Sequence, residues 1–192
     1  FGSIQHWLRI QRPRRRHNPG NGNCLFYAIA HALGDTHTHH GVRRQIVEHM
    51  SLHANTYSLW WDHTSPDPPG TATHCASFHN YLTLLTLEGA WGGYLELHAA
   101  SETFQTTILL LGSTTPPVLF GQYPTRCTLW YDSAHYEMIT SPIPEWMWSF
   151  AGYTDMQPPA PQLQIQEEPV DSNFLQQFPS DLEPIHIVSD SE

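Results

Sequence analysis

The order of the hydrophobic patterns along the chain constrains its fold most strongly. Between Leu25 and Ala100, apolar residues recur at helical spacing. Beyond Ala100 the pattern changes to short β-branched or aromatic runs separated by Pro, Gly or Asp. The expected strands are Thr106–Leu111, Val118–Phe120, Cys127–Tyr131 and Tyr136–Thr140. Helices first and strands later indicate an α+β domain.

Four amphipathic helices are expected before the strands. The first follows Cys24 directly, and Gly34 is placed to end it. The apolar positions that define the four helices are Leu25, Ala28, Ile29, Ala32 and Leu33; Val42, Ile46, Val47 and Met50; Phe78, Tyr81, Leu82 and Leu85; and Leu95, Ala99 and Ala100.

Charge divides the chain into three parts. Residues 1–19 hold five of the eight arginines and are expected to form a basic, mobile lead-in. Residues 20–154 are expected to form the folded domain. Residues 155–192 carry eight acidic residues and no basic one, and are rich in Pro and Gln. They are expected to form a disordered acidic tail, because they offer too little apolar surface to offset chain entropy.

Composition narrows the partners and the compartment. The net charge is −10 and the chain contains no lysine, which argues against nucleic-acid binding by the domain and favours a basic protein partner. No apolar run is long enough to span a membrane. Three scattered cysteines without a CxxC pair favour a reducing, intracellular compartment, the cytoplasm or the nucleus. Because the chain begins with Phe1 rather than Met, it is expected to be part of a longer product.

Cys24 is the candidate nucleophile. The segment Asn-Gly-Asn-Cys-Leu-Phe (21–26) places it at the start of the first expected helix, where free amides and the helix dipole stabilise a thiolate. Gly22 permits a tight turn. The amides of Gly22 and Asn23 are then expected to face an oxyanion, a contribution of about 2.7–4 kcal/mol per donor in other acyl-transfer enzymes. The alternative is that Cys24 is an ordinary buried residue.

His135 is the candidate general base. It lies between two expected strands, in Tyr-Asp-Ser-Ala-His-Tyr-Glu (131–137), where a turn can hold an imidazole rigidly. Among the other histidines, His37, His39 and His40 form a cluster that suggests a metal site. Since no acidic or cysteine partner lies at ligand spacing, we expect no metal and no cofactor. Cys75 and Cys127 are interpreted as structural.

These segments together resemble the ovarian tumour (OTU) family of cysteine proteases. The resemblance spans about Pro19 to Thr140 and depends on the order of five motifs. They are the Cys24 segment, Val-Arg-Arg-Gln-Ile-Val (42–47), Trp-Gly-Gly-Tyr-Leu-Glu-Leu (91–97), the strand Thr107–Leu111 and His-Tyr-Glu (135–137). The resemblance implies a papain-like fold with a small central sheet packed between helices.

The resemblance also implies a function. Cys24, assisted by His135, would hydrolyse isopeptide bonds at the C-terminus of ubiquitin, with ubiquitin or polyubiquitin chains as partner. Asn21 and Glu137 stand where the family usually has Asp, and Asp or Asn, so they are the candidate orienting groups. Trp91, Gly92 and Tyr136 would line the substrate channel, although Trp91 is equally compatible with a core role. Glu96 is expected to be a buried structural carboxylate paired with Arg43 or Arg44.

Two alternative functions follow from the departures from the family pattern. Asn21 and Glu137 are compatible with a ubiquitin-binding pseudo-protease of weakened activity. The absent lysines and the unusual tail are compatible with a polyprotein-processing protease from a virus or mobile element. A separate expectation concerns the tail. The β-prone run Ile185–Val188, followed by Ser and acidic residues, has the form of a SUMO-interacting motif.

Overall fold

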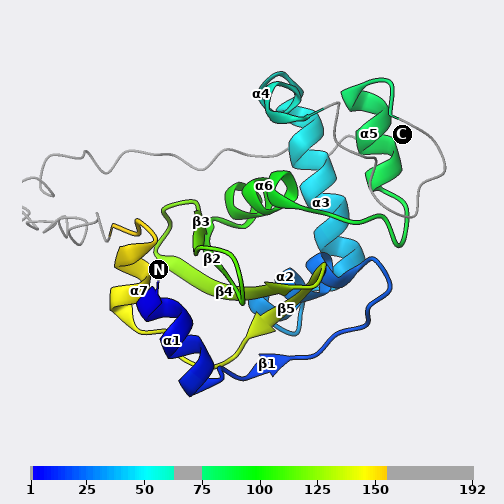
Figure 1. Cartoon of the computed structure of the whole chain (residues 1–192). Helices are drawn as coiled ribbons and strands as arrows, with labels where there is room; N and C mark the ends of the chain where they lie inside the picture. Colours follow the sequence, from blue (N-terminus) through cyan, green and yellow to red (C-terminus); the bar gives the residue numbers. More distant parts are fainter. Residues whose placement is uncertain (1, 63–74, 155–192) are drawn as a thin grey trace, which may run out of the picture. The chain divides into compact units, whose positions relative to one another are not determined.

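Five strands form one mixed sheet at the centre of the fold. The computed structural model describes residues 2–62 and 75–154 (Figure 1). In chain order its elements are α1 (Gly2–Gln11), β1 (Arg15–Arg16), α2 (Cys24–Leu33), α3 (His39–Leu52), α4 (Ala54–Trp60), α5 (Phe78–Leu85), α6 (Tyr94–Phe104), β2 (Thr106–Gly112), β3 (Val118–Phe120), β4 (Thr125–Asp132), β5 (His135–Ile139) and α7 (Glu145–Phe150). The strand order is β1-β5-β4-β2-β3. The β2–β4 pair is parallel, and the other neighbouring pairs are antiparallel.

Strand β2 explains why helices cover both faces of the sheet. All seven of its residues are buried. Because side chains alternate along a strand, Ile108 and Leu110 lie on one face and Leu109 and Leu111 on the other. The first pair packs with apolar residues of α2, α3, α5 and α6. The second pair packs with those of α1 and α7, which lie close together in Figure 1. The prediction of an α+β fold with a small central sheet between helices is therefore confirmed.

The predicted helices and strands are confirmed with small shifts at their ends. Helix α2 begins at Cys24, and Gly34 caps it with a positive φ of 106°, a conformation that glycine adopts at little cost. Helix α6 follows the pair Gly92–Gly93 as predicted. The turn between β4 and β5 is Ser133–Ala134, so His135 is the first residue of a strand rather than part of the turn.

The N-terminal segment corrects the prediction of a mobile lead-in. Residues 2–11 form helix α1, in which Ile4 and Leu8 are buried one helical turn apart. Residues 15–16 form β1, an edge strand antiparallel to β5. The physical reason is that the sheet supplies both the apolar surface under α1 and the hydrogen bonds of β1. Neither is visible in an arginine-rich segment taken alone.

Two short helices, α4 and α7, were not predicted from the sequence. Helices α4 and α7 have seven and six residues, too few for a clear periodic pattern. Among the residues that the structure describes, no helix is both long and apolar enough to cross a membrane. The predicted acidic tail and its Ile185–Val188 motif lie outside the described residues.

Candidate active site

Cys24 occupies the predicted position at the start of a helix. It is the first residue of α2 and is 8% exposed. Burial of the following apolar residues, Leu25 and Phe26, fixes this end of the helix in the core. The unpaired amides of a helix start and the positive dipole end favour an anion at this position.

The loop before Cys24 depends on a close approach between two backbones. Gly22 has a φ of 84°, and a Cβ added there would lie 2.0 Å from the carbonyl oxygen of Gly89. Only glycine fits both constraints. The prediction that Gly22 permits a tight turn is therefore confirmed, and the reason is the packing of this loop against the segment after α5.

Asn23 is the centre of the hydrogen-bond network in this loop. Its Oδ1 accepts from Nη2 of Arg43 at 2.6 Å and from the Gly89 amide at 2.9 Å. Its Nδ2 donates to Oε1 of Glu88 at 2.8 Å. The side chain is 1% exposed as a result of these contacts. Asn23 therefore joins the loop before Cys24 to α3 and to the segment after α5.

Arg43 supports this network from inside the protein. It is 3% exposed, and its Nη1 donates to the carbonyls of Leu85 and Ala90, both at 2.8 Å. Its guanidinium also stacks over the ring of Phe26 at 3.8 Å. Burial lowers the pKa of Arg43 to about 10, so the group remains charged at neutral pH.

Asn21 does not contact His135 in this structure. Its Oδ1 accepts from the backbone amide and from Nδ2 of Asn23, each at 3.3 Å. This is the local turn that Asn side chains commonly form with the backbone two residues later. The contact differs from both expected roles. Asn21 faces Asn23 rather than the imidazole, and the Asn23 amide is engaged by Asn21 rather than left for an oxyanion.

His135 lies beside a carboxylate on the same strand. Because side chains two residues apart share a face of a strand, His135 and Glu137 project in the same direction. The His135 Nε2 is 3.7 Å from Oε1 of Glu137. It is buried and has no hydrogen-bond partner among the described residues. The structure therefore brings Glu137 next to the imidazole, just beyond hydrogen-bond distance.

Glu137 has two closer neighbours, a histidine and an arginine, that the sequence analysis missed. His17 Nδ1 is 3.0 Å from Oε1 of Glu137, and Nη1 of Arg15 is 3.4 Å from Oε2. The pairing of β1 with β5 brings both residues to the carboxylate. Local sequence contains no signal for this contact, since His17 and Glu137 are 120 positions apart. Glu137 is therefore shared among three side chains.

Asn18 was also missed, although it links the two halves of the candidate site. It is 2% exposed. Its Nδ2 donates to the carbonyl of Tyr136 at 2.8 Å and lies 3.4 Å from the carbonyl of Cys24. One amide nitrogen therefore contacts both Cys24 and the residue after His135.

The predicted channel residues have different environments. Trp91 is 40% exposed, whereas Tyr136 is 5% exposed and packs against Tyr131. Burial raises the pKa of the Tyr136 hydroxyl above its ordinary value. At Gly92 an added Cβ would lie 2.5 Å from Cδ2 of Leu25, so glycine is needed for packing against α2. Of these three residues, Trp91 offers the largest exposed surface.

Glu96 is buried as predicted, but its partner differs. Its Oε1 accepts from the Tyr81 hydroxyl at 2.5 Å, and its Oε2 accepts from the Gly93 amide at 2.7 Å. Arg43, one of the expected partners, instead binds Asn23 and two backbone carbonyls. Burial raises the pKa of Glu96 above its ordinary value. The residue caps α6 and fixes the turn after Trp91.

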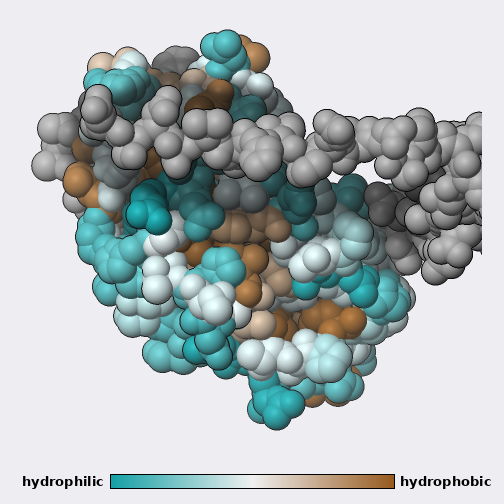
Figure 2. Space-filling model, turned by 180° about the vertical axis from the view of Figure 1, so that it is seen from behind, coloured by the Kyte–Doolittle hydropathy of each residue, from teal (hydrophilic) through white to brown (hydrophobic). Residues whose placement is uncertain are grey.

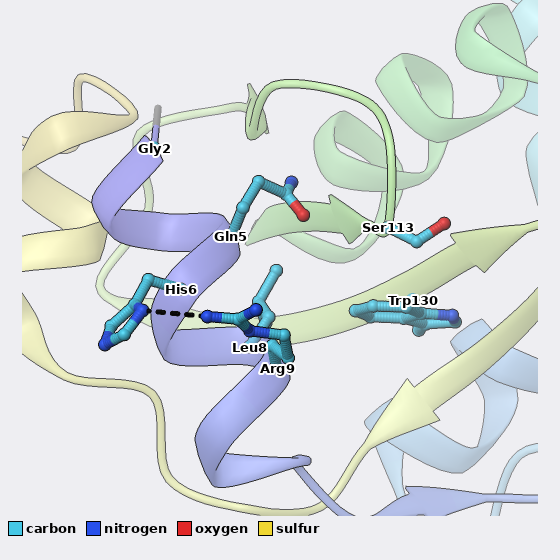
Figure 3. A pocket seen from close by; sticks show the side chains of 7 residues that line it. All are labelled: Gly2, Gln5, His6, Leu8, Arg9, Ser113 and Trp130. Atoms are coloured by element: carbon cyan, nitrogen blue, oxygen red, sulfur yellow. Dashed lines mark hydrogen bonds between the residues drawn. The ribbon is translucent and has the colours of Figure 1, made fainter.

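Cys127 and a hollow beside α1 contribute no residue to this site. Burial raises the pKa of the Cys127 thiol to about 12, which makes it a poor nucleophile. A hollow of about 600 Å³ lies between α1 and Trp130 of β4, on the face of the sheet opposite α2 (Figure 3). In it Arg9 and His6 contact each other at 3.3 Å. None of the predicted catalytic residues lines it.

A cysteine at the start of a core helix and a histidine at the start of the strand beside it are the arrangement expected of a cysteine protease. The sequence profile described as OTU-like cysteine protease matches residues 19–141. The chain belongs to this family.

Curated relatives agree with this assignment. The chain is 31% identical over 110 residues to mouse (Mus musculus) "Deubiquitinase OTUD6B", a match that covers 55% of this chain and 36% of the relative. It is 33% identical over 98 residues to "OVARIAN TUMOR DOMAIN-containing deubiquitinating enzyme 10" of Arabidopsis thaliana, covering 50% of this chain and 23% of that protein. The chain thus matches about a third or less of the length of these relatives.

Solved structures agree with the fold. The OTU domain of OTUD1 superimposes with a TM-score of 0.55 at 21% identity, covering 73% of this chain and 93% of that domain. An OTU deubiquitinase from Wolbachia pipientis, solved bound to ubiquitin, superimposes with a TM-score of 0.52 at 13% identity. That match covers 66% of this chain and 94% of the bacterial chain.

Proposed function

We propose that this chain is a thiol-dependent deubiquitinase that hydrolyses isopeptide bonds at the C-terminus of ubiquitin. The Cys24 thiolate attacks the carbonyl of ubiquitin's last glycine, and His135 transfers the thiol proton to the leaving lysine amine. Water then hydrolyses the thioester, with His135 as the base. The curated relatives named as deubiquitinases and the family's fold support this choice of substrate.

The contact that carries the proposal is made by Asn18. Its side-chain nitrogen lies within 3.4 Å of the Cys24 carbonyl and 2.8 Å of the Tyr136 carbonyl. This amide holds the start of α2 close to the start of β5, where His135 lies. The arrangement supports a Cys24–His135 pair assembled from residues that are 111 positions apart in the sequence.

Glu137 supplies the third group. His135 Nε2 is the nitrogen nearer Glu137, which leaves Nδ1 for the thiol. A carboxylate in this position favours the imidazolium that forms when the thiol is deprotonated. In this mechanism Glu137 is a positioning residue, because it acts through His135 rather than on the substrate.

Gly22 and Cys24 supply the backbone amides for the oxyanion in this mechanism. The Asn23 amide is excluded from this role by its contact with Asn21. The segment that packs on the Cys24 loop carries three exposed apolar side chains. They are Leu87, Trp91 and Tyr94, which are 52%, 40% and 48% exposed. Exposed apolar side chains beside a reactive group suit a protein substrate. Apolar patches also reach the surface on the face seen in Figure 2.

A ubiquitin probe with a thiol-reactive C-terminus tests the proposal. Wild-type protein is expected to gain the mass of the probe, and Cys24→Ala is expected to gain none. Cys127→Ala is the matched control, because the raised pKa of its thiol makes it a poor nucleophile, and it should be labelled like wild type. Loss of labelling in Cys127→Ala, with labelling retained in Cys24→Ala, would show that Cys24 is not the nucleophile.

A second candidate function, a ubiquitin-binding pseudo-protease, is favoured by the contacts of Glu137. This carboxylate is closer to His17 and Arg15 than to His135. Wild-type protein that binds ubiquitin in calorimetry but is not labelled by the probe would establish this second function. Labelling that depends on both Cys24 and His135 would exclude it.

A further inference from the structure

A second cluster of chemically active side chains contacts the Cys24 loop through Asn23. His39 and His40 are the first two residues of α3, and Glu88 lies between α5 and α6. His39 Nε2 is 3.2 Å from Oε1 of Glu88, and His40 Nδ1 is 2.9 Å from Oε2. One nitrogen of each histidine and one oxygen of Glu88 lie within 4.8 Å of one another. The sequence analysis found no acidic partner for these histidines, because Glu88 is 49 positions from His39.

Neighbouring residues hold two of these side chains in place. The ring of His39 stacks on Tyr27 with centroids 3.9 Å apart and an interplanar angle of 24°. Oε1 of Glu88 accepts a hydrogen bond from Nδ2 of Asn23 at 2.8 Å. Partners of this kind orient the ligands in metal sites and are needed for full affinity. The donor atoms are therefore arranged before any ion binds.

The donor set fits one class of ion. Two imidazoles and one carboxylate suit first-row transition ions, of which Zn²⁺ is the probe used below, whereas Ca²⁺ and Mg²⁺ prefer oxygen alone. In a tetrahedral site with bonds of about 2.1 Å, donor atoms lie roughly 3.4 Å apart. One donor atom from each of the three residues lies within 4.8 Å of the other two, so small side-chain rotations bring them to that spacing. His40 and Glu88 have side chains 66% and 54% exposed, so an ion can enter from solvent without any opening of the fold.

We propose that His39, His40 and Glu88 form a zinc-binding site, with the fourth position left to water. The Oε1 of Glu88 also accepts from Asn23, the residue before Cys24, so ion binding changes the charge that the Asn23 amide faces. The site therefore communicates with the loop before Cys24 through a single hydrogen bond. The proposal concerns binding and does not depend on the thiol chemistry proposed above.

Zinc titration of the untagged chain, followed by calorimetry, tests the site. All proteins carry Cys24→Ala, which removes the one cysteine expected to compete for zinc. In this background His40→Ala and Glu88→Gln are each expected to weaken zinc affinity by about tenfold or more. Glu88→Gln is informative because an amide oxygen can still accept from Asn23 while the anionic ligand is lost.

The matched control is His37→Ala, which removes a histidine from the same loop but not from the cluster. It should bind zinc like its parent. Because His17, His135 and Glu137 are also close enough together to hold an ion, His17→Ala is measured in parallel. Zinc affinity that is unchanged by His40→Ala and Glu88→Gln overturns the proposal, and loss in His17→Ala alone places the ion at that other cluster.

The link to the loop has its own measurement. In ¹⁵N-labelled Cys24→Ala protein, zinc is expected to shift the side-chain NH₂ resonances of Asn23. The additional change Glu88→Gln should abolish that shift, and His37→Ala should leave it in place. Zinc that binds through His40 and Glu88 without moving the Asn23 resonances would contradict the proposed communication.

Discussion

At the residue scale, a few buried polar side chains decide where the candidate catalytic groups lie. Asn18, Asn23 and Arg43 are each 3% exposed or less, and each bonds to backbone or side chains far away in the sequence. Buried polar groups of this kind are costly unless satisfied, so they specify one arrangement of the segments they join. None of the three is itself placed to react with a substrate.

Replacement of Asn18 by Ala is expected to destabilise the protein and to disturb the site. Loss of the amide leaves the carbonyl of Tyr136 without this buried donor, at a cost of about 1–3 kcal/mol in the free energy of unfolding. Urea unfolding measures this cost, and labelling by the ubiquitin probe under folding conditions should slow.

Asn55→Ala is the control for this prediction, because Asn55 is exposed on α4. It should change neither quantity appreciably. Normal stability and normal labelling in Asn18→Ala would show that the amide does not hold α2 and β5 together.

At the scale of elements, different helices cover the two faces of the sheet. Helices α2, α3, α5 and α6 form the larger core, which contains Cys24. Helices α1 and α7 close the opposite face. The β4–β5 hairpin then sets the position of His135, because a two-residue turn fixes the register of its strands.

Helix α1 is expected to contribute to the stability of the whole domain. Ile4 is 1% exposed, whereas Ile10 on the same helix is 58% exposed. Ile4→Ala should lower the free energy of unfolding by about 2–5 kcal/mol, because it removes buried methyl groups and leaves a cavity. Ile10→Ala should change it little. Equal effects of the two substitutions in urea unfolding would indicate that α1 does not pack on the sheet.

The hairpin turn offers a stabilising substitution. Ser133 and Ala134 have positive φ values of 51° and 62°, which are unfavourable for residues with a Cβ. Ala134→Gly should raise the free energy of unfolding by about 0.5–1 kcal/mol, since the relieved strain exceeds the added chain entropy.

The control for the hairpin is Ala151→Gly, where φ is −74°. There the same change should destabilise the protein, because glycine relieves no strain at that position. A loss of stability in both variants, measured by thermal or urea unfolding, would contradict the strain at Ala134.

At the scale of the whole molecule, two half-buried histidines couple stability to pH. Burial lowers the pKa of His31 and of His49 below the ordinary value of 6.5. The unfolded chain therefore binds these protons at a higher pH than the folded protein does. It follows that their contribution to the free energy of unfolding is present above pH 6.5 and is lost as the pH falls below it.

Glu96 acts with the opposite sign, because burial raises its pKa and its ionisation at higher pH opposes folding. Because wild type and His49→Gln both contain Glu96, the difference between their free energies of unfolding reports on His49 alone. The destabilisation caused by His49→Gln should be smaller at about pH 5.5 than at about pH 7.5, as wild type loses the contribution of the neutral imidazole. Urea unfolding at both values measures this difference. His79→Gln, an exposed control, should show no such change.

Much of the fold was predictable from the sequence because it depends on local signals. The apolar period after Cys24, the glycine at position 34 and the β-branched runs after Gln105 each act on neighbours in the chain, and they predicted α2 and the strands correctly. The same signals placed Cys24 at the start of a helix. Helix α1 and strand β1 were missed because their stabilising partners lie in the sheet rather than in adjacent residues.

The sequence by itself determined the order of the four predicted helices and four predicted strands, the position of Cys24 and the family. Only the tertiary structure decided that Asn18 joins Cys24 to β5, that His17 shares Glu137, and that Glu88 lies beside His39 and His40. Helix starts and strand periods are encoded by residues a few positions apart. Contacts between residues 49 to 120 positions apart exist only after packing of the core has closed the intervening chain.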